Sequence, residues 1–207
     1  DSDPLIRKEV ALTCGALLIP TYPGFEATSR LANWGVSAKL TSEGVRRLLM
    51  LGVSDPEPAI RAAVLTCLKE NDRFDNFLMH EDTLQALFVA LHDEDFYVRR
   101  IGMDVASRLS PRNPAHIFPA VRKCILASMA QLRFSPTQTQ REEGAVILLG
   151  DVVAGFNRSR LMKGGISHAT PLISPIIVPL IKILLGKLRE ARNTMSTAIL
   201  RTLGEVA

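Results

Sequence analysis

The sequence predicts an all-α fold, a superhelix of stacked antiparallel helical hairpins. Apolar residues recur at helical spacing along most of the 207 residues, whereas the strict alternation of half-buried strands is absent. A turn with acidic residues, followed by a β-branched residue and an arginine, recurs before several of the predicted helices. The composition, 47% hydrophobic and 5% aromatic, excludes a disordered tail and a disulfide-stapled miniprotein.

The repeated turn sets the length of the repeat. Its arginines are Arg7, Arg61, Arg99 and, in a weaker copy, Arg141, at separations of 54, 38 and 42 residues. Helical hairpins of the HEAT type recur at about 40–47 residues. The sequence therefore predicts a HEAT-repeat α-solenoid of four to five repeats over residues 1–207. We interpret the chain as one fragment of a longer solenoid and expect it to self-associate when isolated.

The acids and arginines of these turns are interpreted as structural. A carboxylate at a helix start accepts hydrogen bonds from free N–H groups. Each arginine is expected to pair with an acid of a neighbouring turn, which would form a ladder between repeats. The predicted ladder contains the following residues: Asp3, Arg7, Asp55, Arg61, Asp95, Arg99 and Arg141.

A partner helix is predicted before each repeat helix except the first. These partner helices span residues 42–53, 81–91, 114–132 and 174–192, and the last repeat helix spans 195–206. Asn113 with Pro114, and Ser174 with Pro175, each supply an N-cap and a proline at the first helical position. Small residues such as Gly102 and Gly144 allow neighbouring helices to approach closely.

Two segments, 19–41 and 156–173, interrupt the repeat and are predicted to be loop insertions. Insertions in solenoids lie on the surface and often bind partners. Trp34, the only tryptophan, either packs onto the repeats or anchors a partner protein. The second insertion is either a spacer or a basic partner-binding patch made by Arg158, Arg160 and Lys163.

No motif for catalysis, cofactor binding or metal binding is present in the sequence. The four histidines and three cysteines are dispersed, and no phosphate-binding loop, dinucleotide motif or nucleophile elbow occurs. We therefore expect no catalytic, cofactor-binding or metal-binding residues. The dispersed cysteines are interpreted as reduced thiols of an intracellular protein. The most apolar stretch, 171–186, contains prolines and a lysine and is too short to span a membrane.

Charge is unevenly distributed along the chain. Residues 1–104 hold 11 basic and 16 acidic residues, whereas residues 105–207 hold 14 basic and 5 acidic residues. The net charge of +4 is too small to predict nucleic-acid binding. The asymmetry indicates either docking surfaces of different sign for protein partners or a chance difference between solvated helix faces.

Residues 73–132 carry a more specific resemblance. This segment, RFDNFLMHEDTLQALFVALHDEDFYVRRIGMDVASRLSPRNPAHIFPAVRKCILASMAQL, closely resembles the HEAT-repeat region of the target of rapamycin (TOR) kinases. The stretches IRKEVALTC, LLMLGVSDPEPAIRAAVLTCL and ILRTLGEVA are similar to the same region, in the same order. The two insertions depart from the family pattern.

The resemblance implies a scaffold segment of a serine/threonine kinase of the phosphatidylinositol-3-kinase-related class, with the catalytic domain outside this chain. It implies protein partners, namely a raptor-like or rictor-like subunit and a second TOR copy, in nutrient and growth signalling. It further implies a cytoplasmic location, with lysosomal or vacuolar membranes reached only through the complex. The alternative is a HEAT or armadillo adaptor unrelated to TOR, such as a phosphatase scaffold or a transport receptor.

Overall fold

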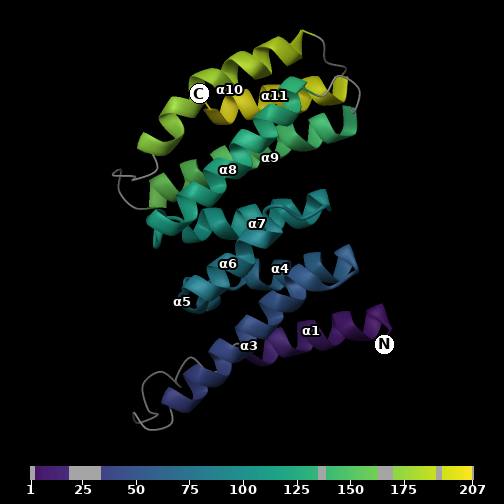
Figure 1. Ribbon diagram of the computed structural model, residues 1–207, viewed down its shortest axis with the longest axis vertical. Helices are drawn as coiled ribbons and strands as arrows, with labels where there is room; N and C mark the ends of the chain where they lie inside the picture. Colours follow the sequence, from purple (N-terminus) through teal and green to yellow (C-terminus); the bar gives the residue numbers. More distant parts are fainter. Residues whose placement is uncertain (1–2, 19–33, 135–138, 163–169, 190–192, 207) are drawn as a thin grey trace. The chain divides into compact units, whose positions relative to one another are not determined.

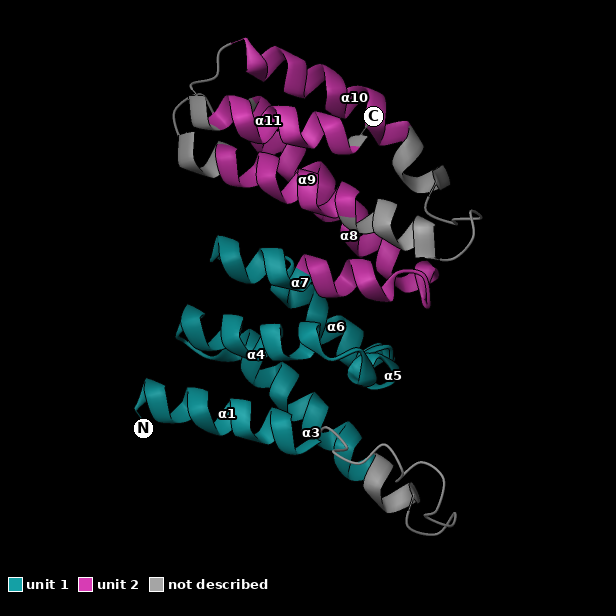
Figure 2. Ribbon diagram, turned by 180° about the vertical axis from the view of Figure 1, so that it is seen from behind, with its two compact units in different colours: residues 1–102 teal, residues 103–207 magenta. Residues whose placement is uncertain are grey.

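The computed structural model describes residues 3–18, 34–134, 139–162, 170–189 and 193–206 (Figure 1). All regular secondary structure in these residues is helical, which confirms the all-α prediction. None of the helices in this part of the chain is long and apolar enough to cross a bilayer. The chain forms two compact units, Asp1–Gly102 and Met103–Ala207 (Figure 2). The HEAT type and the number of repeats stay predictions.

The first unit is an array of helices packed around a leucine-rich core. Helix α3 packs against α1, α4, α5 and α6, and α1 also packs against α4. Leu49, Leu65 and Leu87 are fully buried between these helices. The elements are α1 (Pro4–Leu18), α3 (Trp34–Ser54), α4 (Pro58–Glu70), the 3-10 helix η1 (Asp72–Phe74), α5 (Asp75–Leu78), α6 (Glu81–Ala90) and the first half of α7 (Phe96–Leu109).

Glycines set how closely the helices of the first unit approach. A Cβ atom on Gly15 of α1 would lie 2.6 Å from Cys67 Sγ of α4. A Cβ atom on Gly52 of α3 would lie 3.1 Å from Val64 Cγ1, also of α4. Because real Cβ atoms do not approach a neighbour as closely as 2.6 Å, a side chain at position 15 would force Cys67 or the helices to shift.

The second unit holds the second half of α7, α8 (Pro114–Phe134), α9 (Thr139–Met162), α10 (Thr170–Leu188) and α11 (Asn193–Val206). Helix α8 packs against α9 and α10, and α11 packs against the same two helices. These contacts define two layers, one formed by α8 and α10 and the other by α9 and α11. Leu149, Leu184 and Ile199 are among the residues buried between the layers.

The helices extend into both segments that were predicted to be loops. Helix α3 begins at Trp34, so only residues 19–33 of the first insertion lie outside the described residues. Helix α9 continues to Met162, and α10 begins at Thr170. No proline or glycine occurs between residues 156 and 162, so nothing in that sequence ends α9 before the Gly164-Gly165 pair.

The predicted start of the helix at Ser174 was wrong. Because α10 begins at Thr170, Pro175 and Pro179 lie inside the helix. Pro171 is the proline that occupies the first turn, where the backbone amides have no partner within the helix and a missing N–H costs nothing. The same rule predicts α8 correctly, because that helix begins at Pro114.

Candidate functional site

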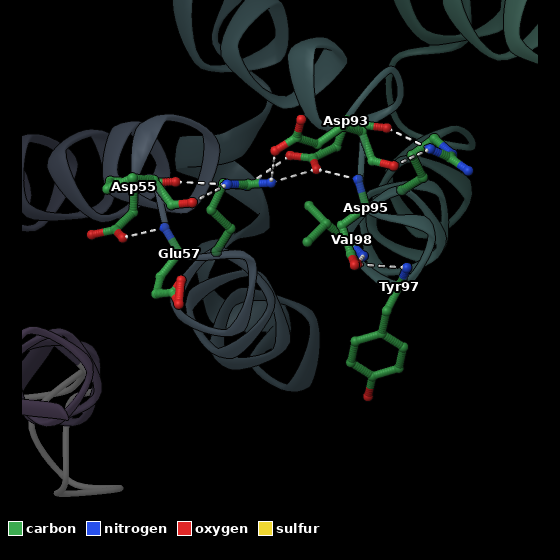
Figure 3. A network of polar contacts seen from close by, with 10 residues as sticks. Asp55, Glu57, Asp93, Asp95, Tyr97 and Val98 are labelled. Carbon is green, nitrogen blue, oxygen red and sulfur yellow. Dashed lines mark hydrogen bonds and ion pairs between the residues drawn. The ribbon is translucent and has the colours of Figure 1, made fainter. Parts of the chain in front are cut away.

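Arg61 joins two turns of the first unit, the one before α4 and the one before α7. Its Nε and Nη2 atoms donate hydrogen bonds of 2.8 and 2.7 Å to the two carboxylate oxygens of Asp93. Its Nη1 atom donates to the carbonyl oxygens of Asp55 at 2.7 Å and Pro56 at 3.2 Å. Figure 3 shows this network. Arg61 is only 5% exposed, so its charge is compensated within the protein rather than by water.

A second arginine makes a similar pair with the turn before α4. Arg7 of α1 donates from Nε and Nη2 to the carboxylate of Asp55, at 3.0 and 3.1 Å. Asp55 is 4% exposed and also accepts the backbone N–H of Glu57 at 2.9 Å. The hydrogen bond from Arg7 outweighs the effect of burial and holds the pKa of Asp55 below its usual range. The hydrogen bonds that Arg61 donates to Asp93 likewise raise the pKa of Arg61.

The two acceptor acids occupy the same place in the repeated turn. Asp55 and Asp93 each lie six residues before an arginine, and each accepts the backbone N–H two residues further on. Arg99 also binds the carbonyl oxygens of its own turn, as Arg61 does. Its Nη1 atom donates to the carbonyl oxygens of Asp93 at 2.6 Å and Glu94 at 3.0 Å. The repeated turn therefore has a defined geometry as well as a sequence pattern.

Capping of α7 and pairing with Arg61 are carried out by two different acids of the same turn, of which the predicted ladder contained only Asp95. Asp95 accepts the backbone N–H groups of Tyr97 and Val98 at 2.8 and 3.0 Å and thus acts as the N-cap of α7 (Figure 3). The carboxylate paired with Arg61 belongs to Asp93, which was absent from the predicted ladder. The matching six-residue spacing from Asp55 to Arg61 and from Asp93 to Arg99 was the signal that could have found it.

The remaining predicted residues stay predictions. Asp3 accepts the backbone N–H of Leu5 at 2.8 Å, as a cap does. Arg141 belongs to α9, Trp34 begins α3, and Arg158 and Arg160 lie near the end of α9, but the structure describes only the backbone at these four positions. Lys163 lies outside the described residues.

Large apolar side chains are exposed on several of the described helices, among them α1, α8 and α10. On α1 the exposed residues line a shallow pocket, and they include Leu5, Ile6 and Val10. On the layer formed by α8 and α10, exposed aliphatic residues lie among basic ones. We call this second surface the basic-apolar face and define it by six residues, Arg122, Lys123, Leu126, Val178, Lys182 and Leu185. Large exposed apolar side chains that cluster are typical of interaction surfaces.

No group of His, Cys, Asp or Glu residues in the described part of the chain could hold a metal ion. The polar network of the first unit consists of arginines bound to carboxylates and carbonyl oxygens, and of carboxylates bound to backbone N–H groups. The geometry supports a structural role for these arginines and acids, and leaves the exposed faces as the candidate interaction surfaces.

Comparison with known proteins gives the chain its family. It is 36% identical over 172 residues to the serine/threonine-protein kinase tor1 of Schizosaccharomyces pombe, an alignment that covers 83% of the chain and 7% of that protein. It is 33% identical over 215 residues to the serine/threonine-protein kinase TOR of Arabidopsis thaliana, which covers 100% of the chain and 8% of that protein. The chain is a segment of the TOR family.

Similarity to TOR extends to animals, because the serine/threonine-protein kinase mTor of Drosophila melanogaster is 30% identical over 205 residues, or 98% of the chain and 8% of that protein. No protein-family model matches the chain. The TOR segment spans less than a tenth of the length of these relatives. The matches confirm the resemblance seen in the sequence and do not favour an adaptor unrelated to TOR.

Proposed function

We propose that this TOR segment is a protein–protein interaction scaffold, which supports the binding of an accessory subunit and the assembly of a dimeric complex. The observation that carries the proposal is that TOR kinases match nearly the whole chain while the chain spans only 7–8% of their length. Catalysis would then belong to the rest of the protein, and this segment would need no catalytic residue or cofactor of its own.

The packing supports a positional role. Stacked helices present a long surface whose spacing is set by the contacts between neighbouring hairpins. In the first unit, Arg7 and Arg61 fix that spacing through two-pronged hydrogen bonds between successive turns. A surface held in this way loses little conformational freedom when a partner binds.

The partners follow from the family resemblance. We propose a raptor-like or rictor-like subunit and a second TOR copy as the proteins bound, and nutrient and growth signalling as the process. The complex would be cytoplasmic and would reach the lysosomal or vacuolar membrane through its other subunits. The absence of a membrane-crossing helix among the described residues is compatible with that proposal.

The test uses the full-length kinase that carries this segment. Removal of the residues equivalent to 1–207 should abolish co-purification of the accessory subunit, while phosphorylation of a short peptide substrate by the kinase domain is retained. A gentler variant, Arg61→Ala, should weaken co-purification because it frees the two turns, and Arg47→Ala on the exposed surface is its control. Unchanged partners and unchanged dimer mass in the deletion variant would contradict the proposal.

A further inference from the structure

One layer of the second unit carries basic charge without acidic charge. Helices α8 and α10 contain five lysines and arginines and not a single aspartate or glutamate. The next carboxylate after α10 belongs to Glu190, beyond the described part of that helix. Because α8 packs against α10, the two acid-free helices form one continuous surface. Its positive potential is therefore not balanced from within the layer.

Helix α3 of the first unit, unlike α8 and α10, has a carboxylate next to its exposed arginines. Arg46 and Arg47 of α3 donate to Glu43 of the same helix at 2.8 and 2.6 Å. These bonds lower the pKa of Glu43 to about 2, so the carboxylate stays charged at any physiological pH. Glu43 thus offsets one of the positive charges on α3, whereas α8 and α10 contain no carboxylate of their own.

Apolar side chains are interleaved with the basic ones on this layer. Val178, Lys182 and Leu185 of α10 are spaced i, i+4 and i+7, which places them in one stripe along the helix. Val178 is 58% exposed and Leu185 is 48% exposed. On α8, Leu126 is 46% exposed and follows Arg122 by four residues and Lys123 by three. Each helix therefore exposes aliphatic surface next to positive charge.

We propose that the basic-apolar face docks an acidic amphipathic helix of a partner protein. This inference rests on the proposed scaffold function and adds the chemistry of the partner. A helix with leucines at i, i+4 and i+7 and glutamates between them would bury its aliphatic stripe against Leu126, Val178 and Leu185. Its carboxylates would meet Arg122, Lys123 and Lys182, which gives charge complementarity at the edge of the contact.

A helical protein partner fits this face better than a membrane or a nucleic acid. Helices that lie in a membrane interface separate their apolar and basic faces, whereas Lys182 lies in the same stripe as Val178 and Leu185. Stacking on nucleobases requires exposed aromatic rings. Helix α10 has no aromatic residue, and Phe118, the phenylalanine of α8 whose side chain the structure describes, is buried.

The experiment measures binding of a fluorescein-labelled peptide to the full-length kinase by fluorescence anisotropy. The probe is a synthetic helical peptide with leucines at i, i+4 and i+7 and glutamates between them. A peptide with lysines in place of the glutamates is the probe control. The double variant Arg122→Glu, Lys123→Glu should bind the acidic peptide at least about tenfold more weakly at low salt. The matched control, Arg46→Glu with Arg47→Glu, should change binding by less than about twofold.

A second variant tests the apolar half of the contact. Val178→Gln with Leu185→Gln should weaken binding of the acidic peptide by about threefold to tenfold, because the aliphatic area buried by the peptide is lost. Both side chains are exposed, so the fold of α10 does not depend on them. Circular dichroism of each variant checks that the helices are retained.

Three results would overturn the inference. One is equal binding of the acidic peptide by the Arg122/Lys123 variant and the wild-type protein. Another is equal binding of the acidic and lysine peptides by the wild-type protein. A third is co-sedimentation with phosphatidylserine-containing vesicles, lost in the Arg122/Lys123 variant, without peptide binding, which would assign the face to a membrane. If the scaffold proposal fails instead, deletion of the whole segment leaves subunit binding unchanged, so the two failures can be told apart.

Discussion

In the first unit, a buried guanidinium ties two turns together, whereas in the second unit a small polar contact accompanies a close approach of helices. Arg61 binds Asp93 and the carbonyl oxygens of its own turn. In the second unit, the hydroxyl of Thr202 on α11 donates to the carbonyl oxygen of Val146 on α9 at 3.1 Å. A Cβ atom on Gly150 of α9 would lie 2.6 Å from the same hydroxyl oxygen.

The comparison teaches that stacked hairpins can be joined in two ways. Charged pairs between turns fix the register at the ends of helices, and their loss leaves a buried charge without compensation. Close contacts between helix backbones fix the distance along the helices, and their loss produces overpacking. Variants at each kind of junction should therefore fail by different mechanisms and to different extents.

The largest effect is expected for Arg61→Ala. The variant leaves the carboxylate of Asp93 in a site where its side chain is only 7% exposed, and it removes the donor to two carbonyl oxygens. We expect the free energy of unfolding to fall by about 3–5 kcal/mol, measured by urea unfolding followed by circular dichroism. Arg47→Ala is the control, because that arginine's side chain is 77% exposed and its ion pair contributes little.

A double variant tests whether the loss of stability comes from the unpaired charge of Asp93. Arg61→Met with Asp93→Leu removes both charges, so it should be more stable than Arg61→Ala alone. A loss for Arg61→Ala no greater than for Arg47→Ala would contradict the role assigned to the buried pair.

The second largest loss of stability is expected where Gly150 of α9 meets Thr202 of α11. Gly150→Ala should cost about 1–3 kcal/mol of unfolding free energy, because the added methyl group meets the Thr202 hydroxyl. Gly186 of α10 is the matched control, since a Cβ atom there would have no neighbour within 4 Å. Gly186→Ala should raise stability by about 0.5–1 kcal/mol, because alanine loses less backbone entropy in a helix. Equal effects of the two substitutions would refute the close contact.

A smaller effect is expected for Thr202→Val, which keeps the shape of the side chain and removes its hydroxyl. Thr202 is buried, and its hydrogen bond to Val146 crosses between α11 and α9. The expected loss is about 1 kcal/mol, seen as a lower melting temperature in calorimetry. Ser196→Ala, at a half-exposed position of the same helix, provides a comparison. A Thr202→Val protein as stable as the wild type would show that the hydroxyl contributes nothing to this junction.

The smallest effect is confined to acid pH. Arg7 holds the pKa of Asp55 below its ordinary value of 3.8. The stabilisation by this carboxylate is therefore complete above about pH 4 and is lost as the pH falls through the lowered pKa. The urea midpoint of the wild-type protein should drop on acidification below pH 4, and Asp55→Asn should show a smaller drop over the same range. Parallel curves for the two proteins would argue against the Arg7–Asp55 pair as the source.

The sequence predicts the helical fold because that fold depends on local signals. Apolar periodicity and the proline of a first turn place α8 without knowledge of the tertiary structure. The start of α10 was misplaced because Pro171 and Pro175 are equally good local signals for a helix start. Nothing in the local sequence distinguishes a proline in a first turn from one that a helix accommodates in its interior.

The partner of Arg61 and the basic-apolar face depend on contacts between distant segments. Asp93 and Asp95 are both acids of one turn. The six-residue spacing to the next arginine marks Asp93 as the counterpart of Asp55, but only the structure shows that it pairs with Arg61 while Asp95 caps α7. The excess of basic residues after residue 105 is visible in the sequence. Its concentration on one layer becomes apparent only when α8 and α10 are seen to pack together.

Because Arg61 binds two turns at once, it affects how the first unit unfolds locally. One guanidinium holds the turn at residues 55–56 and also Asp93, which lies 32 residues after Arg61, so neither turn can detach without releasing the other. Amide protons at the starts of α4 and α7 should then exchange with solvent through a shared fluctuation. A pulling force applied across α4 would be transmitted to the following hairpin, and this part of the TOR segment would yield in one step rather than bend at a hinge.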